Sequence, residues 1–137
     1  MDLYAENILE HYRNPRSKKR LKKATASREE VNASCGDSIV LDLSLKGKRI
    51  EHVGWEGAGC AISQAGMSML AEEIVGKTME EALSLPPKFL QNLLGVPIST
   101  RRLKCALLPL LALHNALHTQ QGRTPETWPE LLEEDSA

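Results

Sequence analysis

The middle of the chain alternates between apolar and polar residues, whereas the regions before and after it follow helical spacing. Apolar side chains recur at every second position between residues 38 and 45, at Ile39, Leu41, Leu43 and Leu45. This alternation predicts a strand with one buried face. A turn signal at Gly47-Lys48 and a second apolar pattern over residues 49–55 predict an antiparallel hairpin. A third, more weakly signalled strand is expected over residues 26–34.

An amphipathic helix is predicted before the strands, over residues 2–13, with Leu3, Ile8 and Tyr12 near one face. Asn14-Pro15 ends this helix, because proline cannot continue the helical hydrogen bonds. The basic stretch that follows is expected to be a loop or a lightly held segment.

Helical spacing returns after the strands. One helix is predicted from Cys60 to Gly76, where glycine is typical of a helix C-terminus. Shorter helices are predicted over residues 78–85 and 87–94.

The run from Cys105 to His118 is apolar on most sides, so a buried helix is expected there. Pro109 is expected to be tolerated because it lies close to the start of that helix. Residues 119–137 are interpreted as a linker and a short acidic helix. With 137 residues in the order helix, strands, helices, we expect one α+β domain, a small antiparallel three-stranded sheet with helices packed on one face.

The formal net charge of −1 provides no general attraction to nucleic acid or acidic lipid, but the charges are unevenly distributed. Residues 13–28 are basic, and the C-terminal region carries Glu126, Glu130, Glu133, Glu134 and Asp135. Either these are solvated surface segments, or they dock to a partner protein. Nucleic acid is disfavoured as a partner, because no aromatic side chains interleave with the cations.

A cytoplasmic location without membrane attachment is expected. The first residues carry no secretory signal, and the longest apolar run, Cys105 to Leu113, is too short to cross a bilayer. Thiols are kept reduced in the cytoplasm, so the cysteines are expected to be ligands or nucleophiles rather than disulfide partners.

Three cysteines lie far apart in the chain, at Cys35, Cys60 and Cys105. The turn Cys35-Gly36-Asp37 places a thiol beside a carboxylate, and the other two thiols begin helical patterns, where the helix dipole favours a thiolate. Three thiols and a carboxylate make the four ligands of a tetrahedral Zn²⁺. A shared metal or sulfur site competes here with three unrelated buried thiols. His114 and His118 form a weaker candidate metal pair.

Longer motifs surround these cysteines. They are Glu10-His11-Tyr12-Arg13-Asn14-Pro15, Asn32-Ala33-Ser34-Cys35-Gly36-Asp37, Glu56-Gly57-Ala58-Gly59-Cys60-Ala61-Ile62-Ser63 and Arg102-Leu103-Lys104-Cys105-Ala106-Leu107. Covering most of residues 1–118, they resemble the NifU N-terminal/IscU/SufU family of iron–sulfur cluster assembly proteins. The resemblance implies an α+β fold, a pyridoxal-phosphate-dependent cysteine desulfurase that supplies persulfide sulfur, and downstream iron–sulfur assembly or acceptor proteins.

The resemblance also implies a ligand set and a branch of the family. Cys35, Asp37, Cys60 and Cys105 would bind Zn²⁺. Scaffold-type members carry histidine before the third cysteine, whereas this chain has Lys104, which resembles the SufU-type branch. The segment between the second and third cysteines is short, which resembles the scaffold branch instead.

We therefore expect a zinc-dependent sulfur acceptor, a co-substrate of the desulfurase more than an enzyme in its own right. Cys35 is expected to accept the sulfur because it lies on a glycine-flanked turn, and Arg102 to hold a carboxylate of the site or of the partner. A second hypothesis is a scaffold on which the same four ligands hold a transient [2Fe–2S] cluster and Cys105 receives sulfur. A third is a structural zinc module that binds nucleic acid. Residues 1–118 would form the assembly domain and 119–137 an acidic C-terminal extension.

Overall fold

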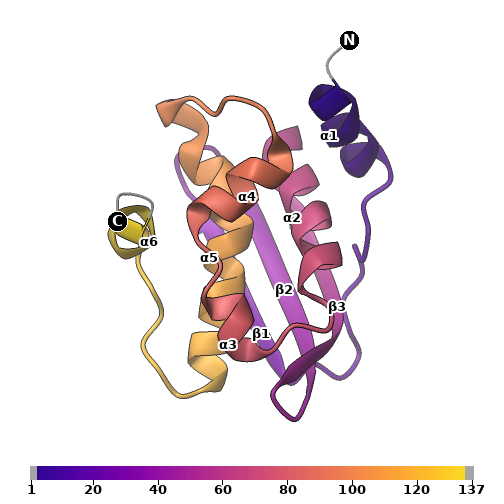
Figure 1. The fold of residues 1–137 in the computed structure, drawn as a ribbon, viewed down its shortest axis with the longest axis vertical. Helices are drawn as coiled ribbons and strands as arrows, with labels where there is room; N and C mark the ends of the chain where they lie inside the picture. Colours follow the sequence, from indigo (N-terminus) through magenta and orange to yellow (C-terminus); the bar gives the residue numbers. More distant parts are fainter. Residues whose placement is uncertain (1–2, 135–137) are drawn as a thin grey trace.

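The computed structural model describes residues 3–134 and contains a three-stranded antiparallel sheet in the order β1-β2-β3 (Figure 1). The strands are β1 (Ala26–Asn32), β2 (Asp37–Lys46) and β3 (Arg49–Ala58). The predicted hairpin and the more weakly signalled third strand are both confirmed. The register pairs Asn32 with Asp37 and Ser38 with Ala58. The turn that carries Cys35 and the end of β3 therefore lie at the same end of the sheet.

Helices cover one face of this sheet, as the α+β prediction requires. α2 (Ala61–Ile74) and α5 (Leu103–Gln120) pack against the strands and against each other (Figure 1). Two short helices connect them, α3 (Met79–Leu83) and α4 (Pro87–Leu94). The alternating side chains of β2 that face α5, from Ile39 to Leu43, are fully buried in the core between the layers.

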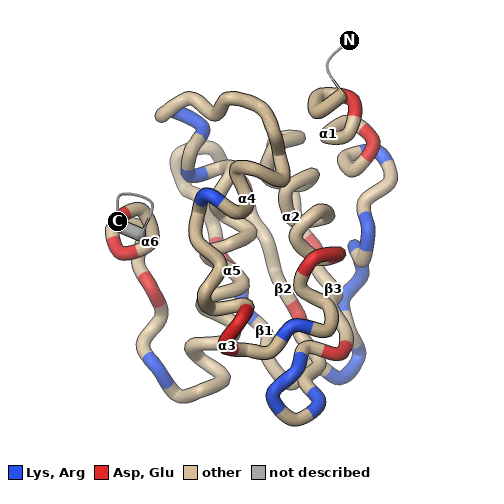
Figure 2. The backbone as a smooth tube through the Cα atoms, in the orientation of Figure 1, with Lys and Arg blue, Asp and Glu red and all other residues tan. Residues whose placement is uncertain are grey.

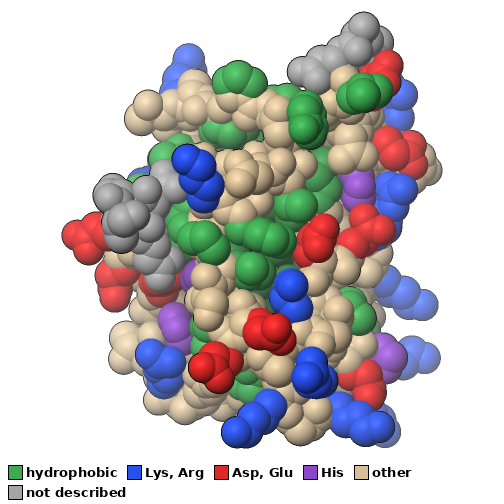
Figure 3. Space-filling view, in the orientation of Figure 1, with side chains coloured by type: hydrophobic (Ala, Val, Ile, Leu, Met, Phe, Trp, Pro, Cys, Tyr) green, Lys and Arg blue, Asp and Glu red, His purple; other side chains and the backbone are tan. Residues whose placement is uncertain are grey.

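The outer surface of the helical layer stays partly apolar. Leu83, Phe89 and Leu93 pack against the core but are only partly buried. Figure 3 shows hydrophobic side chains at the surface between α2 and α4, with acidic and basic side chains around them.

α5 begins two residues earlier than the sequence pattern predicts, because a 3₁₀ turn at Thr100–Arg102 leads directly into it. Pro109 is therefore the seventh residue of the helix and does not lie close to its start, which corrects the prediction. Proline has no N–H, so the carbonyl oxygen of Cys105 has no helical donor at residue 109. The buried position of Pro109 against α2 compensates for this, since Gly66 leaves room for its ring.

α1 (Leu3–Arg13) confirms the predicted helix, and Asp2 lies outside the described residues. The buried side chains of α1 are Ile8 and His11, whereas Leu3 and Tyr12 are 78% and 46% exposed. The expected apolar face is thus only partly used. The ring of His11 instead forms a hydrogen bond with the Ser68 hydroxyl of α2, with 2.7 Å between Nδ1 and Oγ.

The basic segment between α1 and β1 is a loop, as expected, and several hydrogen bonds hold it against the sheet. The Trp55 indole donates to the Arg16 carbonyl at 2.8 Å, and the Trp55 amide donates to Ser17 at 3.1 Å. Arg20 then forms an ion pair with Asp42 on the sheet face that the helices leave open. Figure 2 shows the basic residues of this segment beside β3, whose free edge the segment covers.

The C-terminal region folds onto α5. α6 (Trp128–Glu134) places Leu131 in the core, fully buried. Asn115 of α5 donates to the Glu126 carbonyl at 3.0 Å and accepts from the Glu126 amide, which fixes the chain before α6. Of the acidic residues predicted for this region, Asp135 lies outside the described residues. No helix within residues 3–134 is long and apolar enough to cross a membrane.

Candidate metal and sulfur site

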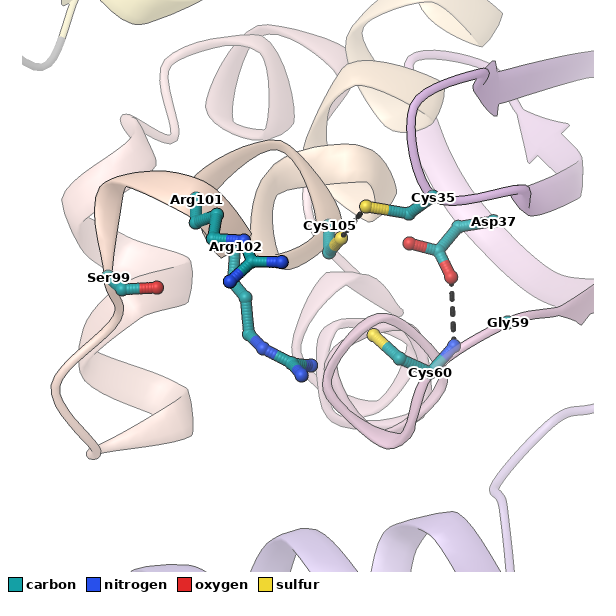
Figure 4. A pocket seen from close by; sticks show the side chains of 8 residues that line it. All are labelled: Cys35, Asp37, Gly59, Cys60, Ser99, Arg101, Arg102 and Cys105. Atoms are coloured by element: carbon teal, nitrogen blue, oxygen red, sulfur yellow. Dashed lines mark hydrogen bonds between the residues drawn. The ribbon is translucent and has the colours of Figure 1, made fainter.

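The three cysteine motifs meet in one pocket of about 440 Å³ at the end of the sheet (Figure 4). The strand register brings the turn after β1 beside the end of β3, and the packing of α5 on the sheet adds the third thiol. The pocket is lined by Cys35, Asp37, Gly59, Cys60, Ser99, Arg101, Arg102 and Cys105.

One thiol lies in a turn between strands, and the other two lie at the starts of helices. Cys35 lies in the turn between β1 and β2, where its amide and that of Gly36 donate to the carbonyl oxygen of Asn32 at 3.2 and 2.9 Å. Cys60 is the N-cap of α2 and has extended backbone geometry. Cys105 lies in the first turn of α5. Two of the three thiols therefore stand at helix N-termini, where the helix dipole favours negative charge.

Three of the four predicted donor atoms are close together, and the three thiols differ in exposure. Sγ of Cys35 and Sγ of Cys105 are 3.1 Å apart. Both, with an Asp37 carboxylate oxygen, lie within 4.8 Å of one another, in a group that does not include Cys60. Cys105 is 2% exposed, Cys60 is half-buried and Cys35 is exposed. All three thiols line one pocket and only Cys105 is buried, which favours a shared site over three unrelated buried thiols.

Asp37 is a buried carboxylate, only 1% exposed, with one oxygen left unpaired. Its Oδ1 accepts the Cys60 amide at 2.8 Å, while Oδ2 has no hydrogen-bond partner among the residues described. Gly59 adopts a φ of +139°, and a side chain there would collide with the Asp37 carboxylate. Glycine is required at this position for both reasons.

The buried thiol and carboxylate groups of this site are suited to a bound cation. Burial raises the pKa of the Cys105 thiol, and the neighbouring Asp37 carboxylate and Cys35 thiol raise it further. Cys105 therefore needs a nearby positive charge before its thiolate form becomes favourable in this buried position. Soft thiolates with one carboxylate form a donor set that suits Zn²⁺, so the residues present fit the metal that the sequence implies.

Arg101 and Arg102 extend over the pocket toward the sulfurs (Figure 4). Both side chains are exposed. Lys104, by contrast, does not line the pocket. Its ammonium group lies 5.9 Å from the centre of the Trp128 ring in α6, a cation–π contact.

Three polar residues near the sulfurs were not singled out from the sequence. The side-chain nitrogen Nδ2 of Asn32 lies 3.5 Å from Sγ of Cys105. Ser63 lies 3.9 Å from Sγ of Cys60 and donates to the Cys60 carbonyl, and Gln64 donates to Ser63 at 3.1 Å. Asn32 and Ser63 fall within the quoted motifs, but only the tertiary contacts distinguish them from turn and helix residues.

The histidine pair in α5 does not form a metal site with other residues in the described part of the chain. Both nitrogens of His114 are engaged, Nδ1 with Glu126 at 2.9 Å and Nε2 with the Leu85 carbonyl at 3.1 Å. The one group of three or more potential metal donors within residues 3–134 is Cys35, Asp37 and Cys105.

The chain is similar in sequence to several known proteins. The family model for the NifU-like N-terminal domain matches residues 3–127. A Bacillus subtilis protein named zinc-dependent sulfurtransferase SufU is 34% identical over 137 aligned residues, covering 88% of this chain and 92% of that protein. An Aquifex aeolicus protein named iron–sulfur cluster assembly scaffold protein IscU is 32% identical over 140 aligned residues, covering 96% of this chain and 88% of that protein.

A crystal structure from Fervidobacterium islandicum, described as a scaffold protein for iron–sulfur cluster assembly in the SUF system, has the same fold. The two superpose with a TM-score of 0.69 at 31% identity, over 82% of this chain and 94% of that one. Fold, cysteine motifs and relatives agree, and the chain belongs to the NifU-like N-terminal domain family of iron–sulfur cluster assembly proteins.

Proposed function

We propose that this protein accepts persulfide sulfur from a pyridoxal-phosphate-dependent cysteine desulfurase and delivers it to iron–sulfur assembly. The observation that supports this most directly is the unequal exposure of two adjacent thiols, with Cys35 exposed and Cys105 buried 3.1 Å from it. A partner can reach the first sulfur, while the second remains inside.

Cys35, Asp37, Cys60 and Cys105 would hold Zn²⁺ in this function. The metal, when bound, keeps thiolates deprotonated without redox chemistry of its own. Arg101 and Arg102 at the pocket mouth offset the excess negative charge of three thiolates and a carboxylate. Arg102 is also suited to hold a carboxylate of the incoming partner.

The chemical step is a thiol–persulfide exchange at Cys35. Its thiolate attacks the terminal sulfur of the desulfurase persulfide, and a new S–S bond forms. The original S–S bond breaks, and the desulfurase cysteine leaves as a thiolate with the electron pair. The terminal SH group moves to Cys35 unchanged, so no external oxidant or reductant is needed.

A second candidate is a scaffold in which the same four residues hold a [2Fe–2S] cluster as cargo. The similarity to proteins named as IscU scaffolds supports it, as does the short segment between Cys60 and Cys105. Lys104 counts against it, because its side chain lies beside Trp128 and offers the site no additional ligand.

The deciding measurement is alanine release by the matching desulfurase under anoxic conditions, with and without zinc-loaded protein. We expect strong stimulation that is lost in Cys35→Ala and retained in Lys46→Ala, an exposed position on the distant hairpin. No stimulation by the unmodified protein, together with a coloured cluster when iron is supplied, would replace the acceptor with the scaffold.

A further inference from the structure

We infer that Asn32 is a positioning residue that gives the cysteines unequal roles. Its side-chain amide donates a hydrogen bond to Sγ of Cys105, which keeps that sulfur as an internal metal ligand. Sulfur uptake is thereby directed to Cys35. The second part of this inference rests on the proposed function, whereas the hydrogen bond can be tested without it.

Asn32 occupies a junction between the two sulfurs. It is the last residue of β1, pairs with Asp37 in the sheet, and is 4% exposed. Its backbone carbonyl accepts the amides of Cys35 and Gly36, so it shapes the turn that carries the exposed thiol. Its side chain is directed at α5, where Nδ2 of Asn32 lies 3.5 Å from Sγ of Cys105.

The other two sulfurs lack an equivalent donor. Cys60 lies 3.9 Å from the Ser63 hydroxyl, whose proton is already donated to the Cys60 carbonyl at 3.1 Å. Within residues 3–134, no nitrogen or hydroxyl donor forms a hydrogen bond with Sγ of Cys35. Its one hydrogen-bond partner there is the thiol of Cys105. Asn32 therefore distinguishes Cys105 from both.

An amide N–H directed at a thiolate stabilises its negative charge and lowers its nucleophilicity, because the sulfur lone pair is partly shared with the proton. The effect is strong for a buried sulfur that water does not reach. Groups that orient a metal ligand in this way contribute substantially to metal affinity. Cys105 is thus a stable ligand and a poor sulfur acceptor, and the exposed Cys35 becomes the reactive thiolate.

The first test uses the Co²⁺-loaded protein and two variants, Asn32→Ala and Asn32→Asp. Both remove the amide donor, and the aspartate variant preserves the size of the buried side chain. We expect the thiolate-to-cobalt charge-transfer absorption to shift in both. Zinc affinity, measured by competition with a chromophoric chelator, should fall by about 10- to 100-fold. Asn92→Ala removes another asparagine, exposed and outside the pocket, and should change neither reading.

The second test locates the persulfide by mass spectrometry after reaction with the desulfurase. We expect it on Cys35 in the unmodified protein and partly on Cys105 in the Asn32 variants. An unchanged cobalt spectrum and zinc affinity in both variants would refute the hydrogen bond to Cys105, and a persulfide confined to Cys35 in them would refute the directing role. If the unmodified protein takes up no sulfur, the proposed function fails, and the cobalt spectrum still decides the role of Asn32 as a metal-site residue.

Discussion

Two aspartates of β2 show how strongly the surroundings of a single side chain decide its role. Asp37 and Asp42 are 1% and 0% exposed. Asp42 is surrounded by donors, with Arg20 Nε at 2.6 Å, the Ser27 hydroxyl at 2.7 Å and the Leu21 amide at 3.0 Å. Asp37 has one amide donor and one unpaired oxygen facing the sulfurs. Asp42 is therefore part of a structural ion pair, whereas Asp37 is suited to bind a metal.

Asp37→Asn should therefore shift stability in opposite directions with and without zinc. In the metal-free protein we expect a gain of about 1–3 kcal/mol, because an unsatisfied buried carboxylate is removed while Oδ1 can still accept the Cys60 amide. The zinc-loaded protein should lose stability, because one ligand is lost. Thermal and urea unfolding of both forms measures the two changes.

Asp42→Asn is the matched control for that experiment, since it removes an equally buried charge that already has its partners. It should destabilise the metal-free and the zinc-loaded protein alike. A loss of stability in metal-free Asp37→Asn as well would show that the Asp37 carboxylate is not a strained, unpaired group.

At the scale of elements, the segment between α1 and β1 is held by side chains that no local pattern connects. Burial by itself raises the pKa of Asp42, but the hydrogen bonds from Arg20, Ser27 and the Leu21 amide outweigh it, so the pKa lies below its ordinary value of 3.8. The charged form of the Asp42 carboxylate is thus more stable in the folded chain than in the unfolded chain.

This depressed pKa predicts how stability depends on pH. The contribution of Asp42 is fully present above its unfolded-state pKa, near 3.8, and is lost as the pH falls through the lower folded-state value. The unmodified protein should be more stable than Asp42→Asn at pH 7, and the difference should shrink below about pH 4. Urea unfolding of both proteins at several pH values measures this.

Glu51→Gln, at a half-exposed side chain of the hairpin, provides the comparison and should show little change in stability at either pH. If the difference between Asp42→Asn and the unmodified protein stays constant down to pH 3, the pairing with Arg20 does not hold the segment.

At the scale of the whole molecule, the C-terminal helix packs as part of the fold. Leu131 is fully buried against the same core as the sheet residues, and Trp128 contacts Lys104 next to the third cysteine. Asn115 joins α5 to the chain before α6 through the backbone of Glu126. We therefore propose that residues 119–134, foreseen as an extension of the assembly domain, fold cooperatively with it.

Leu131→Ala measures this cooperativity. A cavity in a shared core should cost about 2–5 kcal/mol of unfolding free energy, in a single transition. Val75→Ala, at a side chain that is 50% exposed, should change stability by less than about 0.5 kcal/mol. A separate low-temperature transition in Leu131→Ala, with the main transition unmoved, would instead show that α6 unfolds on its own.

Much of the local structure could be predicted from the sequence. The alternation around Leu41 and Leu43 predicted a half-buried strand, and the helices were found to within a few residues, because periodicity records which side of an element faces the core. The three cysteines and Asp37 were chosen from the sequence because their chemistry and turn positions are local properties. The start of α5 was missed, because the 3₁₀ turn before it has no periodic signal.

Only the tertiary structure decided which of these residues meet and how they differ. The sheet register brings Asp37 beside the backbone of Cys60. Helix packing places Cys105 within hydrogen-bond distance of Asn32, although Cys105 lies 73 residues later in the chain. The exposure of Cys35 and the burial of Cys105 likewise arise from how α5 lies on the sheet. A sequence specifies ligand types and local conformation, but distances between remote side chains depend on register and packing, which are properties of the whole chain.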